Sequence, residues 1–130
     1  MKKILIFVLA VVLLAGCTAK KSENTYNQIS MTEAVSMMEE ETDYIILDVR
    51  TAEEYEQKHI TGAINVPNEE IGSEEIELLP DKDAIILVYC RSGNRSKQAS
   101  EKLANLGYTN IYEFGGINDW KGETVSGKAE

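Results

Sequence analysis

The sequence is poor in the residues that build disulfide-rich, collagen-like or disordered proteins. Its 130 residues include only two cysteines and two prolines, while 43% are hydrophobic and 27% are charged. This composition is that of an ordinary globular domain, and it excludes a disulfide scaffold, a collagen helix and low-complexity disorder. Basic residues are also scarce, because 13 Lys and Arg stand against 22 Asp and Glu, giving a formal net charge of -9. A surface of this charge repels phosphate backbones, so we expect no nucleic-acid partner.

A hydrophobic run lies near the beginning of the chain, but it is too short to be a lasting membrane span. Lys2 and Lys3 precede twelve uninterrupted apolar residues, 4–15. As a helix these residues would cover about 18 Å, well short of a hydrocarbon core of about 30 Å. A positive start followed by a short apolar run is typical of a secretory signal. We therefore predict a signal peptide at residues 1–16.

The end of this run, Leu14 to Cys17 (LAGC), resembles the bacterial lipobox. The resemblance implies cleavage just before Cys17 and a diacylglyceryl thioether on its sulfur. Two acyl chains give a stable anchor, whereas one gives only marginal membrane binding. The alternative is an ordinary secretory cleavage site that leaves Cys17 unmodified. We predict a lipoprotein on the extracytoplasmic face of a bacterial membrane, with residues 17–25 comprising the lipidated cysteine and a polar tether.

The anchor restricts what the second cysteine, Cys90, can do. Two cysteines in an exported chain would suggest a disulfide, but a thioether on Cys17 excludes that bond. A free thiol in an oxidising compartment is a liability unless it is buried or used. Cys90 is therefore the first candidate for a catalytic residue.

From residue 26 to residue 122, strand patterns alternate with helical patterns. The two strongest strands are continuous apolar runs rich in β-branched residues, as in strands covered on both faces. Capping residues and glycines mark the helix ends. Such alternation predicts one α/β domain with a mainly parallel sheet between helical layers, followed by a polar tail at 123–130. The expected strands are 44–49, 63–66, 84–89 and 110–114, the expected helices are 30–40, 52–58 and 96–106, and helical turns are expected within 71–79 and at 116–120.

The loop after the second buried strand carries the chemistry. Residues 90–96 read CRSGNRS and join the strand to a helix, a junction where α/β sheets bind ligands. Backbone N–H groups and the helix dipole can surround an anion there, and Gly93 permits the positive φ that such a curl needs. Arg91 and Arg95 add two cations, so we expect the loop to favour the thiolate of Cys90. The simpler interpretation is a buried cysteine followed by an ordinary turn with solvated arginines.

This loop resembles the active-site loop of single-domain rhodaneses, the thiosulfate-type sulfurtransferases. Two further motifs match that family in order and spacing. They are LDVR at 47–50 with EEY at 53–55 and HITGAINVP at 59–67, and FGG at 114–116 with Trp120. The chain departs from the family at Lys58, where rhodaneses commonly have glycine, and in a shortened stretch after Trp120. Neither departure touches the sulfur site.

The resemblance implies a rhodanese-like α/β fold, in which helices flank both faces of a five-stranded, mainly parallel sheet. It also implies that Cys90 attacks the outer sulfur of a donor such as thiosulfate, carries it as a persulfide, and passes it to a thiophilic acceptor such as cyanide or a thiol. Asp48 and Arg50 are expected to support the loop through hydrogen bonds. The residues expected to bind substrate are Arg91, Ser92, Gly93, Asn94, Arg95 and Ser96.

No cofactor or metal is expected. No group of His, Cys and carboxylates has metal-ligand spacing, and neither a dinucleotide nor a phosphate-loop fingerprint occurs. The sole histidine, His59, lies in a motif that is structural in the family, so we do not expect it to be a general base.

Two other functions are compatible with the sequence. Dual-specificity phosphatases of the cell-cycle type and related arsenate reductases use a cysteine in an anion loop, but five residues separate their Cys from the Arg. Here four residues separate Cys90 from Arg95, which favours sulfur transfer. The other alternative is a non-catalytic, membrane-tethered rhodanese-like module that binds a protein partner or senses sulfur or oxidants. Inactive relatives usually lack the loop cysteine, which this chain keeps.

Overall fold

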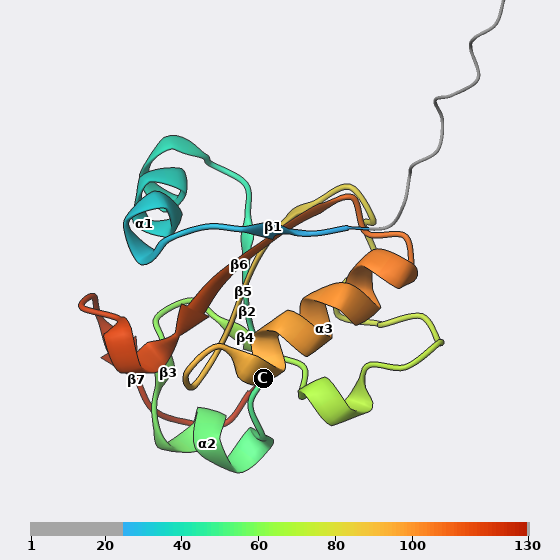
Figure 1. Ribbon diagram of the computed structural model, residues 1–130. Helices are drawn as coiled ribbons and strands as arrows, with labels where there is room; N and C mark the ends of the chain where they lie inside the picture. Colours follow the sequence, from blue (N-terminus) through green and yellow to red (C-terminus); the bar gives the residue numbers. More distant parts are fainter. Residues whose placement is uncertain (1–24, 130) are drawn as a thin grey trace, which may run out of the picture.

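The computed structural model describes residues 25–129. Its centre is a sheet of five parallel strands in the order β1-β6-β5-β2-β4 (Figure 1). These strands are β1 (Asn27–Gln28), β2 (Ile45–Asp48), β4 (Ile64–Asn65), β5 (Ile85–Cys90) and β6 (Asn110–Gly116). The other elements are α1 (Met31–Glu40), α2 (Ala52–Gln57), α3 (Asn94–Asn105), the 3-10 turns η2 (Asn68–Glu70) and η3 (Ile117–Asp119), and an antiparallel pair of β3 (His59–Ile60) and β7 (Thr124–Val125).

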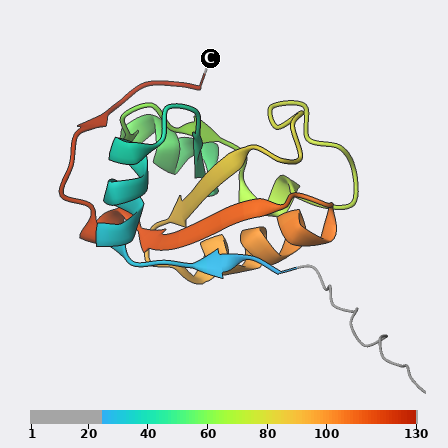
Figure 2. The same cartoon turned by 90° about the horizontal axis from the view of Figure 1, so that it is seen from above.

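The helices cover both faces of the sheet, as expected (Figure 2). Successive residues of a strand point to opposite faces, and β5 shows this period clearly. Ile86, Val88 and Cys90 pack in the cluster that includes α3. Leu87 and Tyr89 pack in the other cluster, with residues of α1 and α2. The predicted five-stranded, mainly parallel α/β architecture is confirmed, and Cys90 points to the face that α3 covers.

Two predicted helix starts have full capping boxes. The side chain of Ser30 accepts the N–H of Glu33 and that of Thr51 accepts the N–H of Glu54, while each Glu accepts the N–H of its cap residue. Such reciprocal bonds satisfy N–H groups that a helix start leaves unpaired. The third helix, α3, begins at Asn94, two residues earlier than the sequence predicts.

Several short elements differ from the sequence expectations. The turn expected within 71–79 is closed by the Leu79 N–H, which donates to the Ile76 carbonyl at 3.0 Å, and an additional 3-10 turn, η2, precedes it after Pro67. The predicted polar tail, 123–130, contains β7, which pairs with β3 and brings the C-terminal segment against the domain. Strand β1 lies at the edge of the sheet, and neither of its residues is buried. The predicted signal peptide (1–16), Cys17 and the tether up to residue 24 lie outside the described residues.

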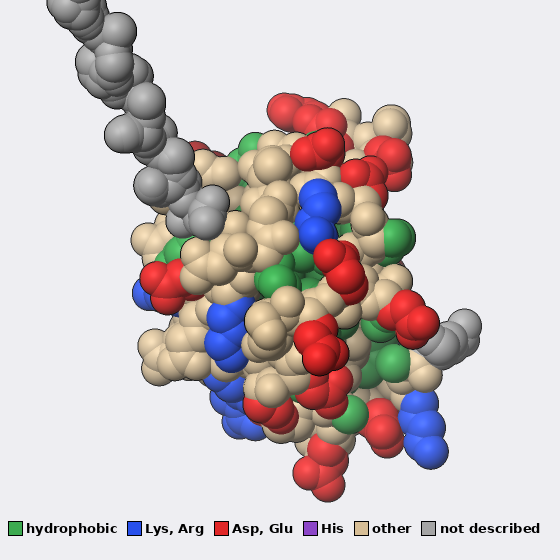
Figure 3. Space-filling model, turned by 90° about the vertical axis from the view of Figure 1, so that its right-hand side faces the viewer, with side chains coloured by type: hydrophobic (Ala, Val, Ile, Leu, Met, Phe, Trp, Pro, Cys, Tyr) green, Lys and Arg blue, Asp and Glu red, His purple; other side chains and the backbone are tan. Residues whose placement is uncertain are grey.

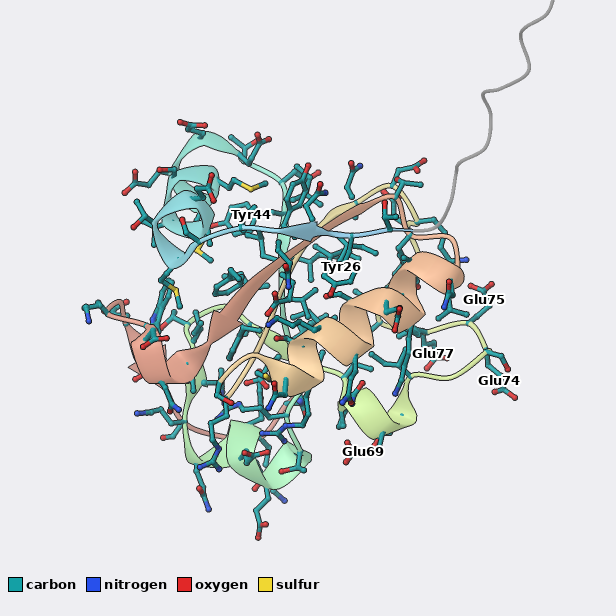
Figure 4. The ribbon with its side chains drawn as sticks, viewed as in Figure 1. Tyr26, Tyr44, Glu69, Glu74, Glu75 and Glu77 are labelled. Carbon is teal, nitrogen blue, oxygen red and sulfur yellow. The ribbon has the colours of Figure 1, made fainter. Side chains whose placement is uncertain are left out.

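Many Asp and Glu side chains lie on the surface of the domain. Acidic side chains are spread over the face in Figure 3, with a few basic ones between them. Figure 4 shows Glu69 on η2 and Glu74, Glu75 and Glu77 on the loop that follows it. Because this charge repels anions, an anion-binding site on this domain needs cations of its own. Among residues 25–129, no helix is both long enough and apolar enough to cross a membrane.

Candidate active site

Cys90 is the last residue of β5 and is only 1% exposed. Its sulfur lies beside the start of α3, where the backbone N–H of Gly93 donates to Sγ at 3.0 Å. The thiol also lies 3.5 Å from Ser96 Oγ, to which it donates. The carboxyl end of the central strand β5 therefore places the sulfur beside polar groups of Gly93 and Ser96.

These polar groups favour the charged form of the sulfur. Burial raises the pKa of the Cys90 thiol, but hydrogen bonds outweigh that effect and the pKa lies below its ordinary value. The charged sulfur accepts these bonds from the hydroxyl of Ser96 and from the backbone N–H groups of Ser96, Gly93 and Ser92. A lowered thiol pKa increases the fraction of nucleophilic thiolate at neutral pH. The hydrogen-bond donors of the loop, rather than its two arginines, are the main cause.

Two glycines give the loop its shape. Gly93 adopts a φ of +117°, a left-handed conformation that L side chains rarely adopt. Gly116, at the end of β6, lies directly against the loop, and a Cβ added there would be 1.9 Å from the carbonyl oxygen of Arg91. The N–H of Asn118 donates to the same carbonyl at 3.2 Å. Gly116 and Asn118 thus pack against the backbone of residues 91 and 92 and fix the shape of the loop.

Both loop arginines bind one carboxylate, which the sequence analysis did not assign to the site. Arg91 Nη2 lies 2.7 Å from Glu54 Oε2, and Arg95 Nη1 lies 2.7 Å from Glu54 Oε1. Hydrogen bonds, first from Arg95 and then from Arg91, hold the pKa of Glu54 well below its usual range despite partial burial. The capping box at Thr51 was the sequence signal that fixed the position of Glu54. Its contact with Arg95 joins residues 41 positions apart in the sequence, so no local pattern predicts it.

Asp48 and Arg50 form a buried ion pair with Oδ2 and Nη2 2.7 Å apart. The hydroxyl of Tyr89 donates to Asp48 Oδ2 at 2.6 Å and accepts the N–H of Ile60 at 3.0 Å. Among residues 25–129, neither side chain of the pair hydrogen-bonds to residues 90–96. The pair therefore braces Tyr89, the residue before Cys90, rather than the loop directly.

The other residues singled out from the sequence lie farther from the Cys90 sulfur or on the surface. Ser92 and Asn94 are exposed. His59 is buried, and its ring stacks on Tyr55 with centroids 3.6 Å apart. Its Nδ1 lies 2.7 Å from the carbonyl oxygen of Tyr55, which gives the ring a structural partner. Lys58 and Trp120 line a polar pocket together with Glu54 and Arg91.

A second carboxylate that the sequence analysis missed lies behind the loop. Glu113 of β6 is 3% exposed, and its Oε2 is 2.5 Å from Ser96 Oγ. The sequence signal is a Glu two residues after Ile111, because both positions share one face of the strand. Within residues 25–129, no group of three His, Cys, Asp or Glu side chains could hold a metal ion.

Comparisons with known protein families give two matches. The family described as Rhodanese-like domain matches residues 30–123. The pattern described as prokaryotic membrane lipoprotein lipid attachment site matches residues 1–18.

Individual proteins agree with the first match. Thiosulfate sulfurtransferase PspE of Escherichia coli (strain K12) is 42% identical over 73 residues, which cover 56% of this chain and 70% of that protein. Thiosulfate sulfurtransferase GlpE of Coxiella burnetii (strain RSA 331) is 33% identical over 97 residues, which cover 74% and 88%.

Solved structures are similar as well. The structure described as a rhodanese with anions from E. coli is 39% identical with a TM-score of 0.59, covering 65% of this chain and 99% of that one. The solution structure of the rhodanese-like domain of the Anabaena sp. Alr3790 protein is 28% identical with a TM-score of 0.69, covering 78% and 80%.

Proposed function

Because this chain belongs to the family of rhodanese-like domains, we propose that it is a sulfurtransferase that carries sulfane sulfur on Cys90. The main support is the geometry of the sulfur, which lies at the carboxyl end of β5 with the Gly93 N–H only 3.0 Å away. The same N–H groups that favour a thiolate can stabilise the charge of a persulfide.

The reaction has two displacement steps. The Cys90 thiolate attacks the outer sulfur of a donor such as thiosulfate, the sulfur–sulfur bond of the donor breaks, and sulfite leaves with the bonding electrons. The product is a Cys90 persulfide with a negative charge on its outer sulfur. A thiophilic acceptor such as cyanide or a thiol then attacks that outer sulfur, and the thiolate leaves in its original form.

The proposed anion-binding groups are Arg91, Arg95 and the N–H groups of the loop. Arg95 also interacts electrostatically with Cys90, which supports its place beside the reacting sulfur. A dianionic donor has to compete with Glu54 for both guanidinium groups, because each already binds that carboxylate. Glu54 therefore sets how strongly the site attracts an anion.

Variants of this cluster should change activity in opposite directions. Arg95→Ala removes a hydrogen bond to a charged group, a loss of about 1.5 to 3 kcal/mol, so kcat/KM for thiosulfate should fall roughly tenfold to a hundredfold. Arg91→Ala should have a similar or smaller effect.

Glu54→Gln keeps a cap acceptor for Thr51 but releases the arginines, so KM for thiosulfate should fall. Steady-state kinetics test both, with the exposed Lys97→Ala as control, and equal kcat/KM in all variants would contradict the assignment.

An assay of both products tests the proposed function. Thiosulfate and cyanide should give sulfite and thiocyanate in equal amounts, and an aryl phosphate ester should release no phosphate. Phosphate release without sulfur transfer would favour a phosphatase. The absence of both reactions would favour a binding or sensing module.

We propose in addition that the protein is anchored outside the cytoplasm through lipid on Cys17. The support is the LAGC sequence after the short apolar run and the match to a lipoprotein attachment site. Cys17→Ser cannot form the thioether, so the protein should leave the membrane fraction or remain unprocessed. Fractionation of cells with immunodetection tests this, with Cys90→Ser as the control that stays bound. A correctly cleaved Cys17→Ser protein that stays in the membrane would contradict the anchor.

A further inference from the structure

Behind the catalytic loop, the carboxyl of Glu113 and the sulfur of Cys90 meet at one hydroxyl, that of Ser96. Glu113 Oε2 lies 2.5 Å from Ser96 Oγ, and Cys90 Sγ lies 3.5 Å from the same oxygen. All three residues are buried. They come from β5, α3 and β6, which pack against one another in the centre of the domain, so their relative positions are fixed by the fold.

The Ser96 hydroxyl has one proton and several acceptors around it. Besides Glu113, the carbonyl oxygen of Gly93 lies at 2.9 Å and that of Gly115 at 3.4 Å. The carboxylate is the nearest, and contacts of about 2.5 to 2.7 Å are typical of a hydroxyl donating to a charged oxygen. When Ser96 donates to Glu113, a lone pair of its Oγ remains for the Cys90 thiol. The contacts then form a continuous path from the thiol proton to the carboxylate.

The negative charge of Glu113 favours movement of the Cys90 proton along this path. Within residues 25–129, no Lys or Arg forms a salt bridge with Glu113, whose Oε2 is otherwise bound by the N–H of Gly115 at 2.9 Å. A thiolate on Cys90 would add a second negative charge to this buried space, which is costly. The other ionisable groups facing the pair are Arg95, which interacts with Cys90, and Tyr26, whose pKa is raised by burial and then by Glu113.

We propose that Glu113 is a positioning residue for sulfur transfer that takes up the Cys90 proton through Ser96, a role that rests on the proposed function. The S–H bond of Cys90 breaks as an O–H bond forms on Ser96 Oγ, while the original proton of Ser96 moves to Glu113 Oε2. Ser96 then donates to the thiolate, Glu113 is neutral, and the net charge of the site is unchanged. When Cys90 returns to the thiol, the proton returns along the same path.

The pH dependence of the first half-reaction tests this relay. Full-length protein in detergent is mixed with thiosulfate, and persulfide formation in a single turnover is followed by mass spectrometry from about pH 5 to about pH 9. The wild-type rate should vary little, because the proton has an internal acceptor. In Glu113→Gln the proton has to reach solvent, so the rate should fall roughly tenfold for each pH unit below the thiol pKa and approach the wild-type rate at high pH.

Matched variants distinguish loss of the proton path from a nonspecific effect of the substitution on the structure. Ser96→Ala should show the same slope, and the double variant should be no slower than the slower single variant, because the two residues act in one path. Glu101→Gln, an exposed carboxylate on α3, should keep the wild-type profile. If Glu113→Gln does not fold, the profile of Ser96→Ala decides. A wild-type profile in the variants, or a Glu113→Gln protein faster at every pH, would overturn the proposal.

A readout without a sulfur donor keeps this test distinct from that of the proposed function. Ultraviolet absorbance of the thiolate, measured against Cys90→Ser, follows ionisation of Cys90 alone. A broad pH dependence in the wild type that becomes a single steep titration in Glu113→Gln supports the relay even if no sulfur is taken up. An identical titration in both proteins would overturn it.

Discussion

Cys90→Ser should take up no sulfur from thiosulfate and should show no turnover. A serine hydroxyl is almost fully protonated at neutral pH, so the loop has no anionic nucleophile to attack the donor. Nor can an oxygen hold the transferred sulfur as a persulfide. The structural change is small, because Cys90 sits at a site whose partners, the Gly93 N–H and Ser96 Oγ, can also bind a hydroxyl.

The measurement is the rate of thiocyanate formation from thiosulfate and cyanide, together with a thermal unfolding curve. The fold should survive, which separates loss of chemistry from loss of structure. Cys17→Ser provides the matched control, because it removes the other cysteine and leaves Cys90 in place. Residual turnover in Cys90→Ser above that of a buffer blank would make the assignment of the sulfur carrier wrong.

Gly116→Ala should also cause a large loss, although residue 116 contributes no side chain to the reaction. Its Cβ would lie 1.9 Å from the Arg91 carbonyl oxygen and 2.6 Å from the Ser92 backbone nitrogen, so the loop or β6 has to move. A misplacement of about 1 Å at an active site can cost roughly a hundredfold in rate. Overpacking of this kind also destabilises a protein by about 1 to 3 kcal/mol.

Gly72→Ala is the control for this prediction, because an added Cβ at Gly72 meets nothing within 4 Å. We expect kcat/KM for thiosulfate to fall by roughly a hundredfold in Gly116→Ala and to stay unchanged in Gly72→Ala. Chemical denaturation measures the accompanying change in the free energy of unfolding. Equal kinetics in the two variants would show that the loop tolerates the displacement.

The central elements of the fold could be predicted because every local signal agreed there. Strands β2 and β5 are short apolar runs whose residues are mostly buried, and their type and place follow from that pattern. The edges could not be predicted in the same way. Strand β1 consists of Asn27 and Gln28, both exposed, and only its pairing with β6 makes it a strand. The same holds for β3 and β7, which are two residues each.

The candidate site also combines residues that the sequence could assign with residues that only the folded chain brings together. Residues 90–96 are contiguous, so the cysteine, the glycine and the arginines could be assigned together from the sequence. Glu54 and Glu113 reach this loop from α2 and β6, and their contacts depend on packing that no local pattern encodes. The arginines, expected to be available for an anion, bind a carboxylate of the protein itself.

The most direct test of sulfur transfer through Cys90 is the mass of the protein after incubation with thiosulfate alone. The full-length protein in detergent should gain about 32 Da, one sulfur atom, and fragmentation should place that gain on the peptide containing Cys90. Adding cyanide should remove the gain and release one thiocyanate for each persulfide. A wild-type protein that never gains this mass, or one that carries the sulfur on a peptide without Cys90, would contradict the account.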